Sequence, residues 1–171
     1  KKTLHAVEQL CSFMISGNNE LQILSSSIER KYETFIFDSL DDFFDTSLLV
    51  HVIRKFVKHN LRSILTEVDP DTDWTDYIKF SLSQHIFSFL PSQESAIRKG
   101  LLKFDKAFSL KMPTSAGKSY ITELLIYKEL KTNPHAKVLY LAPLRSLSRE
   151  LQFRFRRVGS NLGFTTRAIY G

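Results

Sequence analysis

The chain has 171 residues, of which 43% are hydrophobic and 14 are Phe, so it can bury a substantial core and is not intrinsically disordered. The single cysteine, Cys11, excludes an intramolecular disulfide framework, and we find no signal-peptide pattern and no apolar run of membrane-spanning length. We therefore expect a soluble intracellular protein that is cytoplasmic, with nucleoid-associated or, in a eukaryote, nuclear as the alternatives. Residues 1–90 carry a net charge of −4 and residues 91–171 a net charge of +10, so the second part is expected to attract phosphates.

Residues 1–85 are predicted to form an all-α accessory region. Apolar side chains recur at helical spacing in the stretches 4–14, 21–35, 49–68 and 74–89. Gly17 follows the first stretch where a helix-terminating glycine would stand. The aromatic residues on these stretches are expected in the core, and the histidines lack the spacing of metal ligands. We assign this region to no family.

Residues 86–171 alternate between helix and strand patterns. Helices are predicted over 93–103, 117–131 and 146–158, and strands over 107–112, 137–142 and 164–170. The second of these strands reads KVLYLA, a nearly continuous apolar run that is typical of a buried parallel strand. The order predicts an α/β fold with a parallel sheet and right-handed crossovers.

The sequence MPTSAGKS, at 112–119, lies between a predicted strand and a predicted helix. A phosphate-binding loop needs small residues, whose backbone N–H groups can face the anion, and a helix whose N-terminus points at it. Lys118 would then contact the β- and γ-phosphates as the catalytic cation, and the Ser119 hydroxyl would be the Mg²⁺ ligand. The residues that would hold ATP and Mg²⁺ in this loop are Thr114, Ser115, Ala116, Gly117, Lys118 and Ser119. The plainer interpretation is a strand-to-helix connection that contains Gly-Lys-Ser by chance.

MPTSAGKS resembles motif I of superfamily 2 helicases in the Ski-like branch, which includes archaeal DNA-repair helicases and the helicase half of DNA polymerase theta. In that branch the first loop position is often Ala or Met, and here Met112 stands in place of the usual glycine. The resemblance covers about residues 86–171. It implies the first part of a RecA-like P-loop domain that binds ATP and Mg²⁺.

Two further segments resemble the same branch. VLYLAPLRSLSREL, at 138–151, resembles motif Ia, in which a strand delivers a Pro-Leu-Arg turn to the nucleic-acid backbone. The residues that the resemblance places on nucleic acid are Pro143, Leu144, Arg145 and Ser146. FLPSQESAIRKGLL, at 89–102, resembles the Q-motif region, in which Gln93 would hydrogen-bond adenine. Taken alone, Gln93 is also compatible with an ordinary helix start and Arg145 with a surface charge.

The resemblance implies an ATP-dependent helicase or translocase that tracks 3′→5′ on single-stranded nucleic acid, with DNA favoured over RNA. DNA repair and bacterial antiphage defence are roles that such motors serve, and residues 1–85 would then dock a protein partner. A membrane partner is not expected. The remaining arginines near motif Ia, which we assign to a mixture of solvated surface and phosphate contacts, are Arg149, Arg154, Arg156 and Arg157.

In this family a second acidic motif, Asp-Glu, holds Mg²⁺ and orients water, and no Asp-Glu dipeptide occurs in the chain. We therefore expect these residues to be the N-terminal part of a longer helicase, inactive alone, with an incomplete sheet and unpaired strands. Two other interpretations remain open. One is a P-loop NTPase of another class, such as a nucleotide kinase. The other is a non-enzymatic interaction module with a degenerate P-loop.

Overall fold

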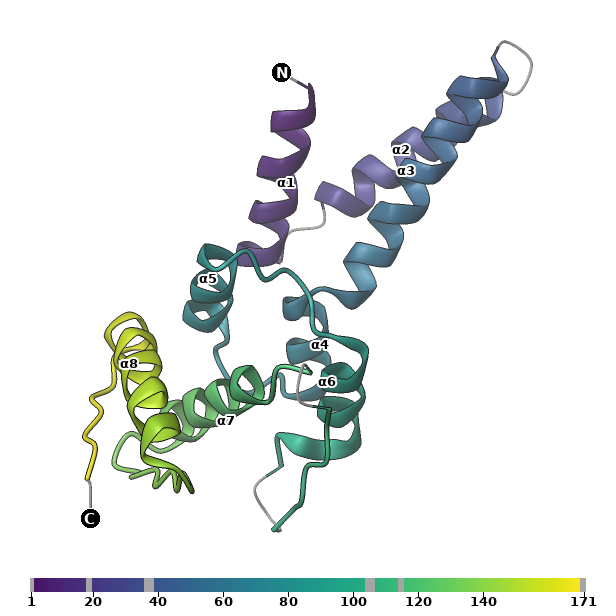
Figure 1. Cartoon of the computed structure of the whole chain (residues 1–171). Helices are drawn as coiled ribbons and strands as arrows, with labels where there is room; N and C mark the ends of the chain where they lie inside the picture. Colours follow the sequence, from purple (N-terminus) through teal and green to yellow (C-terminus); the bar gives the residue numbers. More distant parts are fainter. Residues whose placement is uncertain (1, 18–19, 36–38, 104–106, 114–115, 170–171) are drawn as a thin grey trace.

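The computed structural model describes residues 2–17, 20–35, 39–103, 107–113 and 116–169. The helices are α1 (Lys2–Ser16), α2 (Glu20–Phe35), α3 (Leu40–His59), α4 (Leu61–Val68), α5 (Thr75–Ser83), α6 (Pro91–Ala96), the π-helical turn η1 (Ile97–Leu101), α7 (Lys118–Thr132) and α8 (Arg145–Leu162). In Figure 1, α2 and α3 pair along their length and extend away from the rest, while α7 and α8 lie at the opposite end. None of the helices in these ranges is long and apolar enough to cross a membrane.

The first two predicted helices are confirmed, since α1 and α2 cover the stretches 4–14 and 21–35. Gly17 ends α1 as predicted: its φ is 71°, and its N–H donates to the Phe13 carbonyl at 2.8 Å. This is the left-handed geometry that glycine adopts after the last helical residue.

The predicted helix over 49–68 is wrong in one respect, because Asn60 divides it into α3 and α4. Asn60 has φ −78° and ψ 165°, and its buried side chain serves both helices. The amide nitrogen donates to the Phe56 carbonyl of α3 at 2.8 Å, and the amide oxygen accepts from the Ser63 N–H of α4 at 3.0 Å. Asn60 therefore caps α4 while satisfying the end of α3.

The helix predicted to reach residue 89 ends earlier, at Ser83 of α5. The chain turns at His85, whose φ is 59°, and the Ile86 N–H donates back to the Ser81 carbonyl at 2.9 Å. This turn brings Ser88 beside Asn60, with which it forms an isolated antiparallel bridge. Ile86 and Phe89 still contribute to the core, but from a loop.

The helices predicted in the second half are confirmed, whereas the strands are wrong for this part of the chain. Segments 107–112, 137–142 and 164–169 have no strand structure, and residue 170 lies outside the described residues. Leu139 and Leu141 are 80% and 81% exposed, and Ile169 is 92% exposed. Apolar parallel strands are stable only when neighbouring strands pair with them and helices cover them. Among the described residues no hydrogen-bonded ladder joins these segments, so the predicted parallel sheet does not form there.

One hydrophobic core joins the accessory region to the helix that follows the candidate phosphate loop. Its buried residues are Met14, Leu61, Ile64, Leu65, Trp74, Tyr77, Ile78, Phe89, Ile97, Leu101, Leu102, Tyr120, Ile121, Leu124 and Tyr127. The division between 1–85 and 86–171 remains a prediction from sequence. A continuous core nevertheless crosses it, so the accessory helices support α7 directly.

Aromatic rings, tilted against each other, form the contact between α5 and α7. The ring of Tyr77 lies 5.8 Å from that of Tyr120 and 5.4 Å from that of Tyr127, centroid to centroid. The Tyr120 hydroxyl lies 2.9 Å from the Ser81 hydroxyl, and the Tyr127 hydroxyl donates to the Asp73 carbonyl at 2.8 Å. Burial raises the pKa of Tyr120 to about 12, so this contact stays neutral at physiological pH.

Candidate nucleotide and nucleic-acid site

The candidate phosphate loop leads into α7, which begins at Lys118. Gly117 is the N-cap residue, with φ 69° and ψ 41°, and no side chain caps the helix. The first-turn N–H groups of a helix lack intrahelical partners and carry partial positive charge, which suits an anion. Of the remaining predicted loop residues, Ala116 is buried, whereas Thr114 and Ser115 lie outside the described residues.

Gln93 of α6 forms hydrogen bonds with this loop. Its side chain is only 3% exposed, and its amide nitrogen donates to the Ala116 carbonyl at 2.9 Å and to the Gly117 carbonyl at 3.4 Å. Its amide oxygen accepts from the Leu90 N–H at 3.0 Å. Both ends of the amide therefore have partners within the protein. The predicted contact of Gln93 with adenine is untested and stays a prediction.

Gly117 and Gln93 fit each other closely. A Cβ atom at position 117 would lie 2.5 Å from the amide nitrogen of Gln93. The left-handed backbone of Gly117 also disfavours any other residue there. Glycine is thus required both by the backbone angle and by the approach of Gln93.

Lys118 folds back over the loop that precedes it. Its ammonium donates to the carbonyls of Met112 at 2.9 Å and Pro113 at 3.1 Å, while its side chain remains exposed. Ser119 is half-buried in the first turn of α7. An exposed ammonium and a hydroxyl at a helix N-terminus have the donors and ligand that Mg²⁺-bound phosphates require, so the described loop residues fit that group.

The predicted motif Ia turn lies at the start of α8. Leu144 is the N-cap residue, and Pro143, Leu144, Arg145 and Ser146 are all exposed. The Ser148 N–H donates to the Leu144 carbonyl at 3.0 Å, so this turn passes directly into the helix. Four exposed residues at a helix start can reach a ligand at the surface, but their contact with nucleic acid stays a prediction.

An ion pair that we did not predict links α7 to α8. Glu123 of α7 is 3% exposed, and its carboxylate accepts a hydrogen bond from the Arg154 guanidinium of α8. Ile126 of α7 packs beside this pair against Leu151 and Phe155. The sequence did contain a signal, because Glu123 falls on the apolar face of α7. The two helices that begin at the predicted ATP and nucleic-acid segments are therefore fixed to each other.

A second unpredicted network holds α6 against the accessory helices. Arg98 pairs with Glu94 at 2.8 Å and also with Glu67 at the end of α4, while the His59 ring lies 3.3 Å from Glu94. Partial burial opposes the ionisation of Glu94, but the hydrogen bonds from Arg98 and His59 outweigh it and lower its pKa. This network positions α6, and hence Gln93, against α3 and α4.

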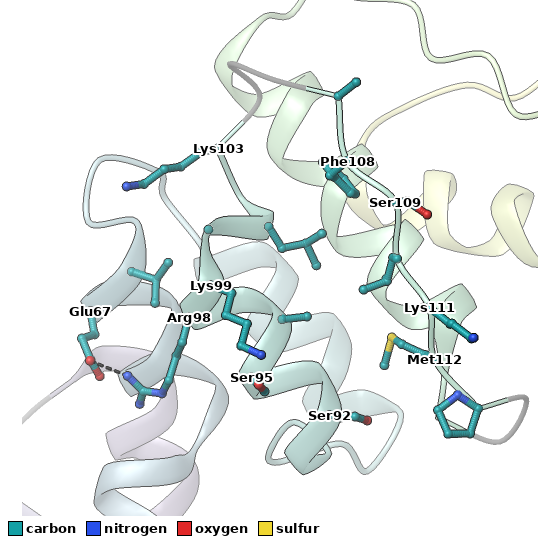
Figure 2. Close-up of a pocket in the computed structure, with 17 residues that line it drawn as sticks. Glu67, Ser92, Ser95, Arg98, Lys99, Lys103, Phe108, Ser109, Lys111 and Met112 are labelled. Carbon is teal, nitrogen blue, oxygen red and sulfur yellow. Dashed lines mark hydrogen bonds and ion pairs between the residues drawn. The ribbon is translucent and has the colours of Figure 1, made fainter.

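A cavity of about 960 Å³ adjoins the loop. Figure 2 shows that Ser92, Ser95 and Lys99 line one side of it, while Phe108, Lys111 and Met112 belong to the segment that forms the other. The cavity separates the segment 107–113 from α6 and η1.

Comparison with known proteins identifies the second half of the chain. Residues 90–171 match the family model for DEAD/DEAH box helicases. The chain carries a segment of a DEAD/DEAH box helicase domain. The resemblance to superfamily 2 helicases is thereby confirmed, and this match does not favour the nucleotide-kinase alternative. A search of solved structures gave no significant match.

Three relatives extend this assignment. The Hachiman protein HamB of Bacillus cereus is 35% identical over 127 residues, which are 72% of this chain and 11% of that protein. Activating signal cointegrator 1 complex subunit 3 of Dictyostelium discoideum is 47% identical over 38 residues, 22% of this chain and 2% of that protein. The ATP-dependent DNA helicase Hel308 of Methanocaldococcus jannaschii is 31% identical over 75 residues, 42% of this chain and 6% of that protein. The chain thus spans a small part of each relative.

The similarity to HamB extends beyond the helicase segment. It covers 72% of the chain, whereas residues 90–171 make up less than half of it, so the match must continue into the α-helical part. We assigned the first 85 residues to no family, and part of this region is now matched by HamB.

Proposed function

We propose that the loop at 112–119 binds the phosphates of ATP with Mg²⁺ as part of an ATP-dependent helicase or translocase. The observation that supports this most is Gly117, a left-handed N-cap glycine held against buried Gln93, in a segment that belongs to a helicase family. Lys118 would exchange its bonds to the loop carbonyls for bonds to the β- and γ-phosphates, and Ser119 would ligate Mg²⁺. Bound ATP would supply the β–γ phosphoanhydride bond, whose cleavage by water would drive movement.

In this proposal the chain's own residues bind ATP and orient it. The Lys118 ammonium offsets negative charge that develops on the transferring phosphoryl oxygens. The Gln93 amide nitrogen can donate to adenine only if it shares or releases the Ala116 and Gly117 carbonyls. Adenine binding and the position of the loop at 112–119 would therefore be coupled through the Gln93 side chain.

The exposed turn Pro143–Ser146 is the part that we propose for contact with a single nucleic-acid strand. Such contacts are made mainly to phosphates and are largely independent of sequence, so binding should weaken as salt rises. We favour DNA over RNA, as the resemblance implies, and one relative is named as a DNA helicase. A motor of this kind would act in the cytoplasm at the nucleoid.

The test is the rate of ATP hydrolysis by the intact protein with and without single-stranded DNA or RNA. We expect nucleic acid to stimulate hydrolysis, and Lys118→Ala to abolish the stimulated rate. Lys137→Ala, which removes an exposed lysine after α7, serves as the matched control and should retain it. Hydrolysis at one rate with and without nucleic acid would rule out the helicase proposal.

We further propose antiphage defence as the biological role and α3 as the contact for a protein partner. The similarity to a bacterial protein over both parts of the chain favours this role over DNA repair. Phe44, Leu48 and Val52 of α3 are 64%, 63% and 52% exposed and lie four residues apart, on one face of the helix. Deletion of residues 1–85 would expose the hydrophobic core that these residues share with α7. A sharper test is therefore the triple variant Phe44→Ser/Leu48→Ser/Val52→Ser. A partner that copurifies with the wild-type protein should be lost from this variant, and protection of cells against phage should fall with it; retention of both contradicts this proposal.

A further inference from the structure

The outward face of α8 combines arginines with one exposed aromatic ring. Leu151, Phe155 and Val158 are buried, so these positions define the inner face of the helix. At 3.6 residues per turn the opposite face carries the residues that we call the basic face, namely Arg149, Phe153, Arg156 and Arg157. All four are exposed, and Phe153 is 72% exposed.

The rotation of α8 about its own axis is fixed by its contacts. The buried Glu123 of α7 holds Arg154, on the flank of α8, while Tyr140 packs edge to face on Phe155 with ring centroids 5.5 Å apart. The basic face therefore cannot turn inward without breaking this partly buried ion pair. Its side chains project from a rigid support, which favours a binding surface over a mobile charged segment.

The charge of this face is not compensated within the described residues. Glu150 is the one acidic residue of α8, and no ion pair there joins an acidic side chain to Arg149, Arg156 or Arg157. A helix that binds a membrane surface presents several apolar side chains outward, whereas α8 presents Phe153 alone and packs Leu147, Leu151 and Phe155 in the core. Arginines interleaved with an aromatic ring suit a single strand, whose phosphates pair with guanidinium groups and whose bases stack on rings.

We propose that the basic face of α8 extends the nucleic-acid surface from the motif Ia turn along the helix. Arg149, Arg156 and Arg157 contact phosphates of a single strand, and Phe153 stacks on one base. The surface runs about 18 Å from Arg145 to Arg157 at 1.5 Å per residue. This inference rests on the proposed function, because it requires that the turn at the start of α8 binds the same strand.

The test is binding of labelled oligothymidylate and oligouridylate of equal length to the intact protein, followed by fluorescence anisotropy at several salt concentrations. The variant Arg149→Gln/Arg156→Gln/Arg157→Gln should bind both more weakly. Its log–log salt dependence should be shallower by about 2, since each phosphate contact on a single strand contributes roughly 0.7. Phe153→Leu should weaken binding about tenfold at unchanged salt dependence, whereas Phe153→Tyr should bind as the wild type does.

The matched control removes three exposed charges elsewhere, as Arg30→Gln/Lys55→Gln/Lys58→Gln on α2 and α3, and should bind as the wild type does. Equal weakening in both triple variants would show a mere effect of net charge and overturn the inference. Wild-type affinity in the α8 variant, with weakened binding in Arg145→Gln, would overturn it while the proposed function stands. Absence of binding by the wild-type protein would overturn both.

Two further outcomes are decisive. If the α8 triple variant is unfolded by circular dichroism, the three single substitutions replace it, each expected to lower the salt slope by about 0.7. Binding of the wild-type protein to phosphatidylserine vesicles that is lost in the α8 variant, with oligonucleotide binding unchanged, would assign this face to a membrane and refute the proposal.

Discussion

Replacement of Gly117 by alanine would perturb the candidate phosphate loop in two ways that can be measured separately. The first is the left-handed backbone at φ 69°, which costs a residue with a Cβ about 1–2 kcal/mol. The second is contact with Gln93, whose amide nitrogen would lie 2.5 Å from the new Cβ. Gln93 can move away only by giving up its bond to the Ala116 carbonyl, and an unpaired buried group costs about 1–3 kcal/mol.

Gly117→Ala alone should therefore lower the free energy of unfolding by about 2–5 kcal/mol. In a Gln93→Ala background the second cost is absent, and the same substitution should cost only about 1–2 kcal/mol. Urea unfolding of the wild-type protein, both single variants and the double variant gives the coupling energy, which we expect at about 1–3 kcal/mol.

Additive costs, with Gly117→Ala equally damaging in both backgrounds, would refute the close fit of Gly117 and Gln93. Gln93→Ala also predicts a functional effect. Since Gln93 joins α6 to the loop, its loss should weaken ATP binding even where the protein remains fully folded. Unchanged ATP affinity in Gln93→Ala would show that this bond does not position the loop.

Three further variants test the rest of the structure. Asn60→Ala should lower the free energy of unfolding by about 2–3 kcal/mol in urea, because it removes the cap of α4 and the bond to α3; a loss under 0.5 kcal/mol would contradict the break at this residue. Glu123→Gln should cost about 1.5 kcal/mol, near the lower end for a bond to a charged group because Arg154 is 39% exposed, and an unchanged thermal midpoint would argue against the link. The pKa of Glu94 is lowered in the folded state, so its ionised form stabilises the fold above its unfolded pKa, and this contribution is lost as the pH falls through the lower folded value. Glu94→Gln should accordingly destabilise the protein by up to about 1 kcal/mol at pH 7 and progressively less as the pH falls below the unfolded pKa of Glu94, measured by urea unfolding over that range; an equal loss at every pH would exclude the pairing with Arg98.

Local sequence signals predicted the helices well. The apolar spacing of α1, α2, α7 and α8 was sufficient, and Gly17 ended α1 as expected, because these features depend on neighbours within one or two turns. The division at Asn60 was missed, since the apolar stripe continues on both sides of it with helical spacing. The available signal was an asparagine three residues before a serine whose N–H it caps.

The strands failed because a strand depends on partners distant in sequence. Apolar runs such as 137–142 predict burial in a sheet, and where no ladder forms they remain exposed. The candidate site shows the same division between local and distant information. Gly117 and Lys118 could be identified from the loop pattern, whereas the bond from Gln93 to the loop and the pair of Glu123 with Arg154 depend on packing between helices. Those contacts became evident only in three dimensions.

The most direct test of the central claim is calorimetric titration of the intact protein with ATP in the presence of Mg²⁺. We predict binding by the wild-type protein and by Lys137→Ala, and an affinity at least about tenfold lower for Lys118→Ala, the loss expected when one charge-assisted contact to phosphate is removed. Equal affinity of Lys118→Ala and the wild-type protein for ATP would contradict the assignment of residues 112–119 as a phosphate-binding loop.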